Sequence, residues 1–205
     1  AIMVMTVLAC AQIDDQDKVS NCLKKISISS RHVLSLINDV LDMSKIERSQ
    51  IALGRMKIHL PKLMDELAAI IEPQAKAAGI QFHMQAEGIT NPRFYGDMLR
   101  LNQIFINILS NAIKFTPEGG SVGFLVKELP PVRDDGYVRY CFTIRDTGVG
   151  IKKEFLEHIF EPFTRSTNPS RVEGTGLGLS ITRGLVVLMG GDIHVESNEL
   201  QGTDF

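Results

Sequence analysis

The stretch that most constrains the fold is residues 97–116, DMLRLNQIFINILSNAIKFT. Its apolar residues recur at spacings of three and four, which predicts one buried face of an amphipathic helix. These residues are Leu101, Ile104, Phe105, Ile108, Leu109 and Ala112. At about 100° per residue, a polar stripe beside this face consists of Arg100, Asn107, Asn111 and Lys114. Such a stripe is either solvated surface or a binding site for a metal–phosphate group, since two asparagines and a lysine lie in register on it.

The composition is globular and argues against several classes of function. Of 205 residues, 44% are hydrophobic and 22% charged, which fits one ordinary domain plus a smaller element. The net charge of −2 shows no basic excess, so nucleic acid is not a predicted partner. Cys10, Cys22 and Cys141 form no C-x-x-C pair, which favours a reducing cytosolic setting over disulfides or a zinc site. No apolar run approaches the roughly 20 residues of a membrane helix, so we expect no direct membrane contact.

The N-terminal region, residues 1–49, predicts part of a helical hairpin. Residues 1–11 continue an apolar helix, either Asp14 or Asp15 caps the next one, and residues 17–47 are strongly helical. A 4-3 alternation extends over three heptads and consists of Val19, Leu23, Ile26, Ser30, Val33, Ile37 and Val40. Four more apolar residues widen this stripe: Leu34, Leu36, Leu41 and Met43. Two antiparallel helices cannot bury so wide a stripe, so we expect a homodimeric four-helix bundle. The alternative is that the hairpin packs only on its own globular domain.

The second domain, residues 50–205, predicts an α+β fold. Strands are expected at 56–60, 80–86, 122–126, 138–144, 192–197 and 203–205, and helices at 61–78, 97–116 and 177–189. A polar loop is expected over 87–95, and a short helix at 152–159 within the irregular segment 146–175. This alternation indicates an α/β sandwich, a mixed, mostly antiparallel sheet with helices on one face.

The segment 146–150, DTGVG, follows directly on a predicted strand. A carboxylate at a strand end can accept a hydrogen bond from an exocyclic amine such as that of adenine. The two glycines let the backbone approach a flat ring, which a Cβ would obstruct. A tight turn with no ligand explains the same residues equally well.

The segment 174–180, GTGLGLS, opens the last predicted helix, where free N–H groups bind phosphate. It fits neither the Walker A nor the Rossmann glycine pattern, and a flexible hinge is compatible with it. Between the two glycine segments, Phe155, Phe160 and Phe163 either anchor a lid or form ordinary satellite packing. Arg165 either reaches a phosphate or is solvated.

Five motifs occur in one order: N-x-x-x-N on a helix, D-x-G-x-G, I-F-E-P-F, G-T-G-L-G-L-S and G-T-x-F. In this order they resemble the ATP-binding catalytic domain of sensor histidine kinases, in the superfamily of gyrase, chaperone and mismatch-repair ATPases. Residues 30–47 are similar to the second helix of the kinases' dimerisation and phosphotransfer hairpin. The resemblance covers essentially the whole chain and implies a Bergerat-type ATP-binding fold after the hairpin.

The resemblance also implies a site for ATP and Mg²⁺. Asn111 would ligate the magnesium ion, Asn107 would support the metal and phosphates, and Lys114 would neutralise phosphate charge. Asp146 would read the adenine amine, helped by the Thr203 hydroxyl. The other implied ATP-binding residues are Gly148 and Gly150, which line the base, Ile151, Phe163, Arg165, Thr175, Leu177 and Leu179, and Gly174, Gly176 and Gly178, which form the lid end over the triphosphate.

Two further features bear on the reaction. The hydrolysing members of the superfamily place a glutamate where Asn107 stands, and an amide cannot act as a general base, which favours phosphoryl transfer to a protein side chain. The kinases' acceptor histidine has no match, since all histidines lie in other contexts: His32, His59, His83, His158 and His194. Because the chain begins without methionine and within a helical pattern, we expect the acceptor upstream of Ala1, so this fragment holds no catalytic histidine.

The leading hypothesis is the cytoplasmic catalytic core of a sensor histidine kinase whose parent is anchored in the cell membrane. It would pass the γ-phosphoryl group of ATP to the upstream histidine, for relay to an aspartate on a response-regulator receiver domain. A non-catalytic nucleotide-sensing module or degenerate kinase is one alternative. A superfamily ATPase, with steady turnover and no acceptor histidine, is the other.

Overall fold

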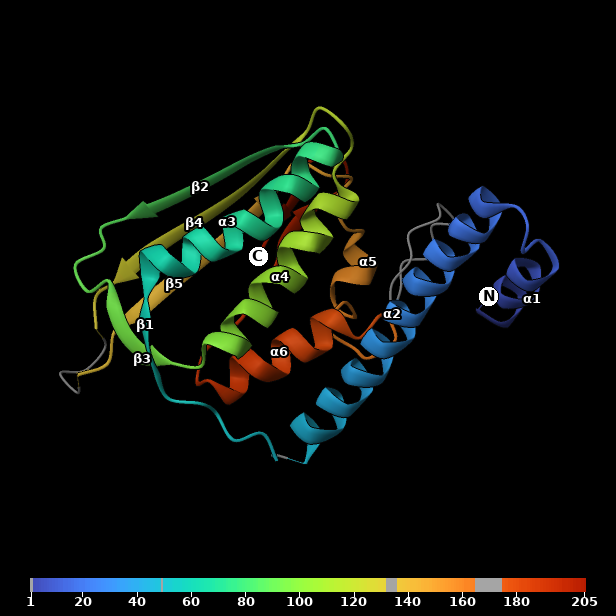
Figure 1. Cartoon of the computed structure of the whole chain (residues 1–205). Coiled ribbons are helices and arrows are strands. Elements are labelled where there is room, and N and C mark those ends of the chain that lie inside the picture. Colours follow the sequence, from blue (N-terminus) through green and yellow to red (C-terminus); the bar gives the residue numbers. More distant parts are fainter. Residues whose placement is uncertain (1, 49, 132–135, 165–174) are drawn as a thin grey trace.

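The computed structural model describes residues 2–48, 50–131, 136–164 and 175–205. A helical hairpin projects from a globular α/β part (Figure 1). Its first helix, α1 (Ile2–Ala11), turns back into the long helix α2 (Gln16–Glu47). The carboxylate of Asp15 accepts a hydrogen bond from the Lys18 N–H at 3.1 Å and so caps α2. The expected cap is confirmed, and it is Asp15 and not Asp14.

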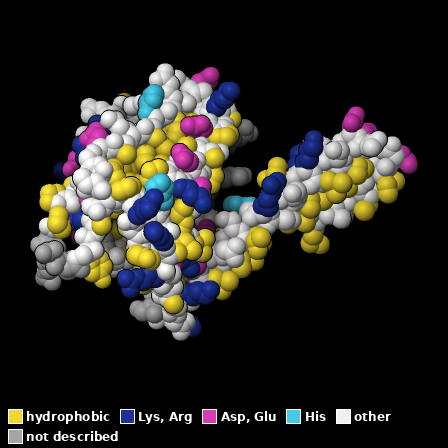
Figure 2. All heavy atoms as spheres, turned by 60° about the vertical axis from the view of Figure 1, so that its left-hand side comes forward, with side chains coloured by type: hydrophobic (Ala, Val, Ile, Leu, Met, Phe, Trp, Pro, Cys, Tyr) yellow, Lys and Arg dark blue, Asp and Glu magenta, His cyan; other side chains and the backbone are white. Residues whose placement is uncertain are grey.

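Helix α2 has two unlike stretches. Near its end, Met43 and Ile46 pack against the core of the globular part. Nearer the hairpin turn, apolar side chains are left in solvent, with Leu34 58% and Ile37 52% exposed, and Figure 2 shows hydrophobic side chains along the projecting hairpin. Packing on its own domain thus accounts for only part of the apolar stripe, and the homodimer stays a prediction. Within the described ranges, no helix is both long enough and apolar enough to span a bilayer.

Five strands form one mixed sheet in the order β2–β4–β5–β7–β6. β2 is parallel to β4, and the other neighbours are antiparallel, which confirms the predicted mixed, mostly antiparallel sheet. The strands are β2 (Gln81–Glu87), β4 (Ser121–Leu129), β5 (Arg139–Asp146), β6 (Glu196–Asn198) and β7 (Gly202–Asp204). Because β7 lies beside β5, Thr203 is in register with Asp146.

Some predicted boundaries are wrong. The loop expected over 87–95 ends early, because β3 (Arg93–Gly96) pairs antiparallel with β1 (Met56–His59) in a separate two-stranded ribbon. Ile58 and Phe94 are partners in this ribbon and pack in the core. Leu60 begins a helix and does not end the first strand. The helix expected over 152–159 is reduced to α5 (Lys153–Leu156), and the strand expected from 192 begins at Glu196.

Three helices cover one face of the sheet, as predicted (Figure 1). They are α3 (Leu60–Ala77), α4 (Met98–Phe115) and α6 (Gly178–Leu188). All six apolar residues predicted on the inner face of α4 are buried. They join Leu67 of α3, Phe124 of β4 and Ile181 of α6 in one core. Burial of this face leaves the polar stripe of α4 along the border between core and solvent.

Candidate functional site

The polar stripe of α4 begins at a well-capped helix end. The Asp97 carboxylate accepts the Arg100 N–H at 3.0 Å and also the Gly54 N–H at 2.7 Å. Along the stripe, Arg100, Asn107 and Asn111 are partly buried, whereas Lys114 is exposed. The stripe is therefore not simply solvated surface, because three of its four residues are partly buried.

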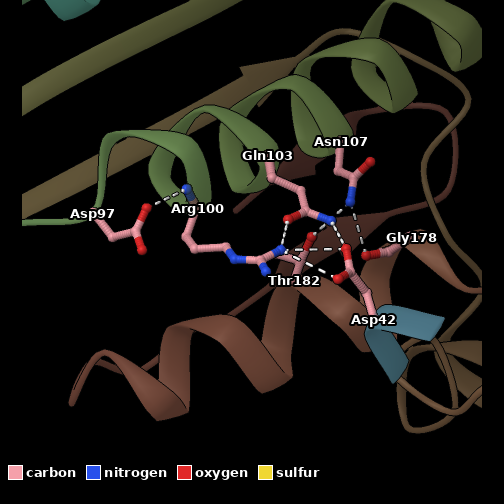
Figure 3. Close-up of polar contacts among 7 residues, drawn as sticks. All are labelled: Asp42, Asp97, Arg100, Gln103, Asn107, Gly178 and Thr182. Atoms are coloured by element: carbon pink, nitrogen blue, oxygen red, sulfur yellow. Dashed lines mark hydrogen bonds and ion pairs between the residues drawn. The ribbon is translucent and has the colours of Figure 1, made fainter. Parts of the chain in front are cut away.

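Asn107 joins α4 to the start of α6. Its Nδ2 donates to the Gly178 carbonyl at 3.2 Å and to the Thr182 hydroxyl at 3.4 Å (Figure 3). The Thr182 side chain is completely buried. Both bonds use the amide nitrogen, so among the described residues the amide oxygen of Asn107 has no hydrogen bond. The sequence analysis missed Thr182 as a partner of Asn107; its signal in the sequence is a hydroxyl one turn after Gly178.

Asn111 lies one turn further along α4. Among the residues that the structure describes, no hydrogen bond holds its side chain, so its amide oxygen is available as a hard ligand of the kind that Mg²⁺ accepts. No group of three or more His, Cys, Asp or Glu side chains in the described ranges could hold a metal ion. A magnesium ion here would depend on Asn111 together with nucleotide oxygens and water. The ammonium group of Lys114, one turn on, lies 5.3 Å from the centre of the Phe115 ring.

The C-terminal end of α4 meets the DTGVG turn. The Phe115 carbonyl accepts a hydrogen bond from the Val149 N–H at 3.2 Å. A Cβ added at Gly148 would lie 2.6 Å from that same carbonyl oxygen, so only glycine permits the approach. Helix α4 thus runs from the glycine segment at α6 to the glycine turn after β5. Asn111 and Lys114 lie on it between these two contacts.

Asp146 ends β5 and is 6% exposed. Its carboxylate accepts the Gly148 N–H at 2.8 Å. Burial raises the pKa of the Asp146 carboxyl, and hydrogen bonds from the backbone N–H groups of Gly148 and Thr203 oppose that shift. The Thr203 hydroxyl is also buried and lies 3.0 Å from the Ser197 hydroxyl. A desolvated carboxylate with a hydroxyl beside it suits recognition of an amine on a flat base.

Gly150 and Ile151 serve the far side of the same turn. Gly150 has φ +69°, and a Cβ there would lie 2.0 Å from the Asn198 carbonyl oxygen. The Ile151 N–H donates to the Ser197 hydroxyl at 2.8 Å. Both residues fasten the turn to the β6–β7 hairpin. Their contacts therefore hold Asp146 and Thr203 in place, and Ser197 is a further residue that the sequence analysis missed.

The second glycine segment is described from Thr175 onward. The Thr175 hydroxyl accepts the Leu177 N–H at 3.0 Å and donates to Asp39 of α2 at 3.3 Å. Gly176 has φ +73°, and its carbonyl accepts the Phe163 N–H at 2.9 Å. The Leu177 side chain is completely buried, so its role is core packing, while Leu179 is partly buried. Two predicted site residues, Arg165 and Gly174, lie outside the described residues.

The comparisons identify the class of protein. The family model described as "Histidine kinase-, DNA gyrase B-, and HSP90-like ATPase" matches residues 96–205. The chain therefore belongs to this ATPase family. It is 35% identical over 201 residues to the sensory/regulatory protein RpfC of Xanthomonas campestris, covering 97% of this chain and 27% of RpfC. It is 34% identical over 189 residues to the autoinducer 2 sensor kinase/phosphatase LuxQ of Vibrio vulnificus, covering 89% of this chain and 22% of LuxQ. The chain thus spans about a quarter of the length of these relatives.

Solved structures agree with this assignment. Full-length ShkA in complex with AMPPNP superposes with a TM-score of 0.75 at 31% identity, covering 93% of this chain and 38% of ShkA. The catalytic domain of histidine kinase ThkA superposes with a TM-score of 0.60 at 29% identity, covering 74% of this chain and 92% of that domain. The resemblance to the catalytic domain of sensor histidine kinases is thereby confirmed, as is the α+β fold.

Proposed function

We propose that this chain is the catalytic core of a sensor histidine kinase. It binds Mg-ATP and transfers the γ-phosphoryl group to a histidine on a helix upstream of this segment. The observation that carries the proposal is the path of α4, which connects the glycine segment at α6 through Asn107 with the Asp146 turn through Phe115. The AMPPNP complex of ShkA supports nucleotide binding in a fold of this kind.

The phosphate side of the proposed site is built from α4 and α6. Asn111 would ligate the magnesium ion with its amide oxygen, which has no hydrogen bond within the described part of the chain, and the ion would supply charge neutralisation during transfer. Asn107, held through its nitrogen by Gly178 and Thr182, would present its oxygen toward the metal and phosphates. An amide here cannot activate water as a carboxylate would, which supports transfer over hydrolysis.

The base side of the proposed site is the Asp146 turn. The buried Asp146 carboxylate would accept a hydrogen bond from the exocyclic amine of adenine, and the Thr203 hydroxyl would lie beside it. Gly148 would let the ring approach the backbone. Guanine presents a carbonyl where adenine presents its amine, so the same carboxylate would disfavour it.

The remaining parts of the proposal concern partners. The exposed apolar stripe of α2 would be covered in a homodimer, and the acceptor histidine would lie upstream of Ala1, near the start of the hairpin helix that α1 ends. A response-regulator receiver domain would take the phosphoryl group onto an aspartate. The solved ThkA complex with its response regulator TrrA, 22% identical and with a TM-score of 0.68, shares the fold. We place the domain in the cytoplasm of a membrane-anchored parent.

Two measurements test the proposal. The first is calorimetric titration of this chain with Mg-AMPPNP, and Asn111→Ala should weaken binding roughly ten- to hundredfold, since a bond to a charged partner contributes about 1.5–3 kcal/mol. The second is incorporation of acid-labile phosphate from ATP by a longer chain that includes the upstream helix. Retention of that phosphotransfer in Asn111→Ala would overturn the metal role.

A matched control is available on the same helix. Asn102 precedes Asn111 by nine residues, which at about 100° each places it on the opposite side of α4. Its Oδ1 is buried without a hydrogen-bond partner among the described residues. Asn102→Ala should therefore leave nucleotide affinity unchanged. Steady ATP turnover by the chain alone, with no phosphorylated protein, would favour the ATPase alternative.

A further inference from the structure

Helix α2 presents two carboxylates, one turn apart, to the nucleotide-binding domain. Asp42 accepts a hydrogen bond from Gln103 Nε2 at 2.8 Å, and both its oxygens lie 3.3 Å from Arg100 Nη1 (Figure 3). The same Arg100 nitrogen donates to Gln103 Oε1 at 2.7 Å. The Arg100 and Asp42 side chains are only 16% and 19% exposed. This ion pair is largely removed from water, so loss of either partner leaves a nearly buried charge uncompensated.

Asp39 reaches the phosphate side of the proposed ATP site. Its Oδ2 accepts the Thr175 hydroxyl at 3.3 Å, and that hydroxyl accepts the Leu177 N–H at 3.0 Å. Leu177 is the residue that caps α6 at its N-terminal end. The N–H groups at such a helix end are unpaired and carry partial positive charge, which favours an anion beside them. In this structure the nearby anion is a carboxylate from α2.

The same helix end would receive phosphates. Asn107, the proposed support of the metal and phosphates, is bonded to the Gly178 carbonyl in the first turn of α6. A second anion there would be repelled by the Asp39 carboxylate, whereas the charge of Asp42 is compensated by Arg100. Burial raises the pKa of Asp39 and the charge of Asp42 adds to this, while the Thr175 hydrogen bond and the charge of His32 oppose it. The Asp39 carboxylate thus already occupies the position beside the Thr175 hydroxyl at the start of α6.

We propose that Asp39 and Asp42 are positioning residues that hold the nucleotide-binding domain docked on α2. This docking competes with the binding of nucleotide phosphates at the start of α6. This inference rests on the proposed ATP site. Docking of Asp39 on Thr175 and binding of phosphates at the start of α6 oppose each other. Because such coupling is reciprocal, nucleotide weakens the docking by the same factor as docking weakens nucleotide binding. Movements of α2 would in this way set the nucleotide affinity of the domain.

The first test is the affinity of the whole chain for Mg-AMPPNP by calorimetry. Asp39→Asn should bind about two- to fivefold more tightly, the effect of one charge near a helix terminus. Asp42→Asn should bind more tightly because loss of its ion pair with Arg100 weakens the docking. Asp39→Glu keeps the charge and should keep the affinity of the unaltered chain. Asp17→Asn is the matched control, because Asp17 is exposed on α2 and lies roughly 33 Å along the helix from Asp39, well beyond electrostatic screening.

The second test reads the docking itself. Ile46 packs against Gly184 of α6, so a thiol introduced by Ile46→Cys, with Cys10→Ser and Cys141→Ser, reports whether α2 leaves α6. Mg-AMPPNP should increase the labelling rate of this thiol severalfold. Asp42→Asn should increase it without nucleotide. If Asp42 had a purely structural role, Mg-AMPPNP would not change the labelling rate of this thiol.

The outcomes separate the two proposals. If the unaltered chain fails to bind Mg-AMPPNP, both the proposed function and this inference fall. If it binds, but the two asparagine variants bind equally or more weakly, only this inference falls. Slower or unchanged thiol labelling with nucleotide overturns it as well. Circular dichroism identifies an unfolded variant, in which case the remaining variant and the labelling rate decide.

Discussion

Gly184 of α6 lies so close to Ile46 of α2 that a Cβ on the glycine would stand 2.6 Å from the Ile46 Cγ2 methyl. The missing side chain lets the two helices approach where the hairpin meets the globular part. A glycine within a helix ordinarily costs about 1 kcal/mol relative to alanine. Close packing of α2 on α6 offsets that cost here.

This contact predicts strong coupling between the two positions. Gly184→Ala alone should lower the free energy of unfolding by about 1–2 kcal/mol, because the added methyl overpacks the contact. In an Ile46→Ala background the clash is gone, and the same change should raise the free energy of unfolding by about 1 kcal/mol. Urea unfolding of the four proteins measures the coupling. Simple additivity would show that the helices do not touch in solution.

Substitution of Asp146 by asparagine should change stability and nucleotide affinity in opposite directions. Asp146→Asn should weaken Mg-AMPPNP binding roughly ten- to hundredfold, since a charge-assisted hydrogen bond to the base is lost. The same change should make the protein more stable at neutral pH, because a buried carboxylate no longer has to ionise.

The pH dependence checks the sign of this effect. The pKa of Asp146 is raised in the folded protein above its ordinary value of 3.8, so the folded state binds this proton more tightly than the unfolded state. This carboxyl should therefore lower the free energy of unfolding as pH rises from 3.8 through its folded pKa. Urea midpoints of Asp146→Asn and the unaltered protein should diverge over that range. Parallel curves would contradict the burial of a titrating carboxyl.

Substitution of Thr182 should affect nucleotide affinity indirectly, through Asn107. Thr182→Val keeps the shape of the buried side chain but removes the hydroxyl that accepts a bond from Asn107. The free energy of unfolding should fall by about 1 kcal/mol, and Mg-AMPPNP affinity should fall severalfold because Asn107 is less well oriented. Thr182→Ser, which restores the hydroxyl, should recover most of the affinity. Equal affinities for the two variants would remove Thr182 from the site.

The hydrogen bonds of Glu128 should make the loop at Thr90 and Asn91 sensitive to acid. The side-chain amide and backbone N–H of Asn91, with weaker contributions from Thr90, hold the pKa of Glu128 at about 2. A lowered carboxyl pKa means that this stabilisation is present above the ordinary value of 4.5 and is lost as pH falls toward about 2. The protection factors of the Thr90 and Asn91 amides against hydrogen exchange should fall in that window. Glu128→Gln should lower these protection factors already at neutral pH, and unchanged protection in both experiments would contradict the assignment.

Local periodicity made α4 predictable, whereas long-range pairing hid other elements. The apolar face of α4 repeats over about three turns, and every predicted residue on it is buried. The four-residue strand β3 has no such signal, since its conformation depends on pairing with β1, far back in the sequence. Asp39 and Asp42 were read only as part of a bundle helix. Their partners, Thr175 and Arg100, lie on other elements that only the folded chain brings near.

The site motifs were predictable in type but not in detail. Asp146, Gly148 and Thr203 meet at one end of α4, and Asn107 meets Gly178 at another point along it. Roles that follow from a ligand stay predictions, among them the magnesium bond of Asn111. The sequence analysis left Arg100 without a role, and its ion pair with Asp42 supplies one.

The sheet order has a consequence for the synthesis of the protein. Strand β7 follows β6 in the sequence, yet it lies between β5 and β6 in the sheet. During translation, β5 therefore exposes an unpaired edge until residues 202–204 leave the ribosome, and open edges invite wrong partners. The helices and β2–β4–β5 can assemble earlier. Asp146 acquires its neighbour Thr203 only after β7 has been made.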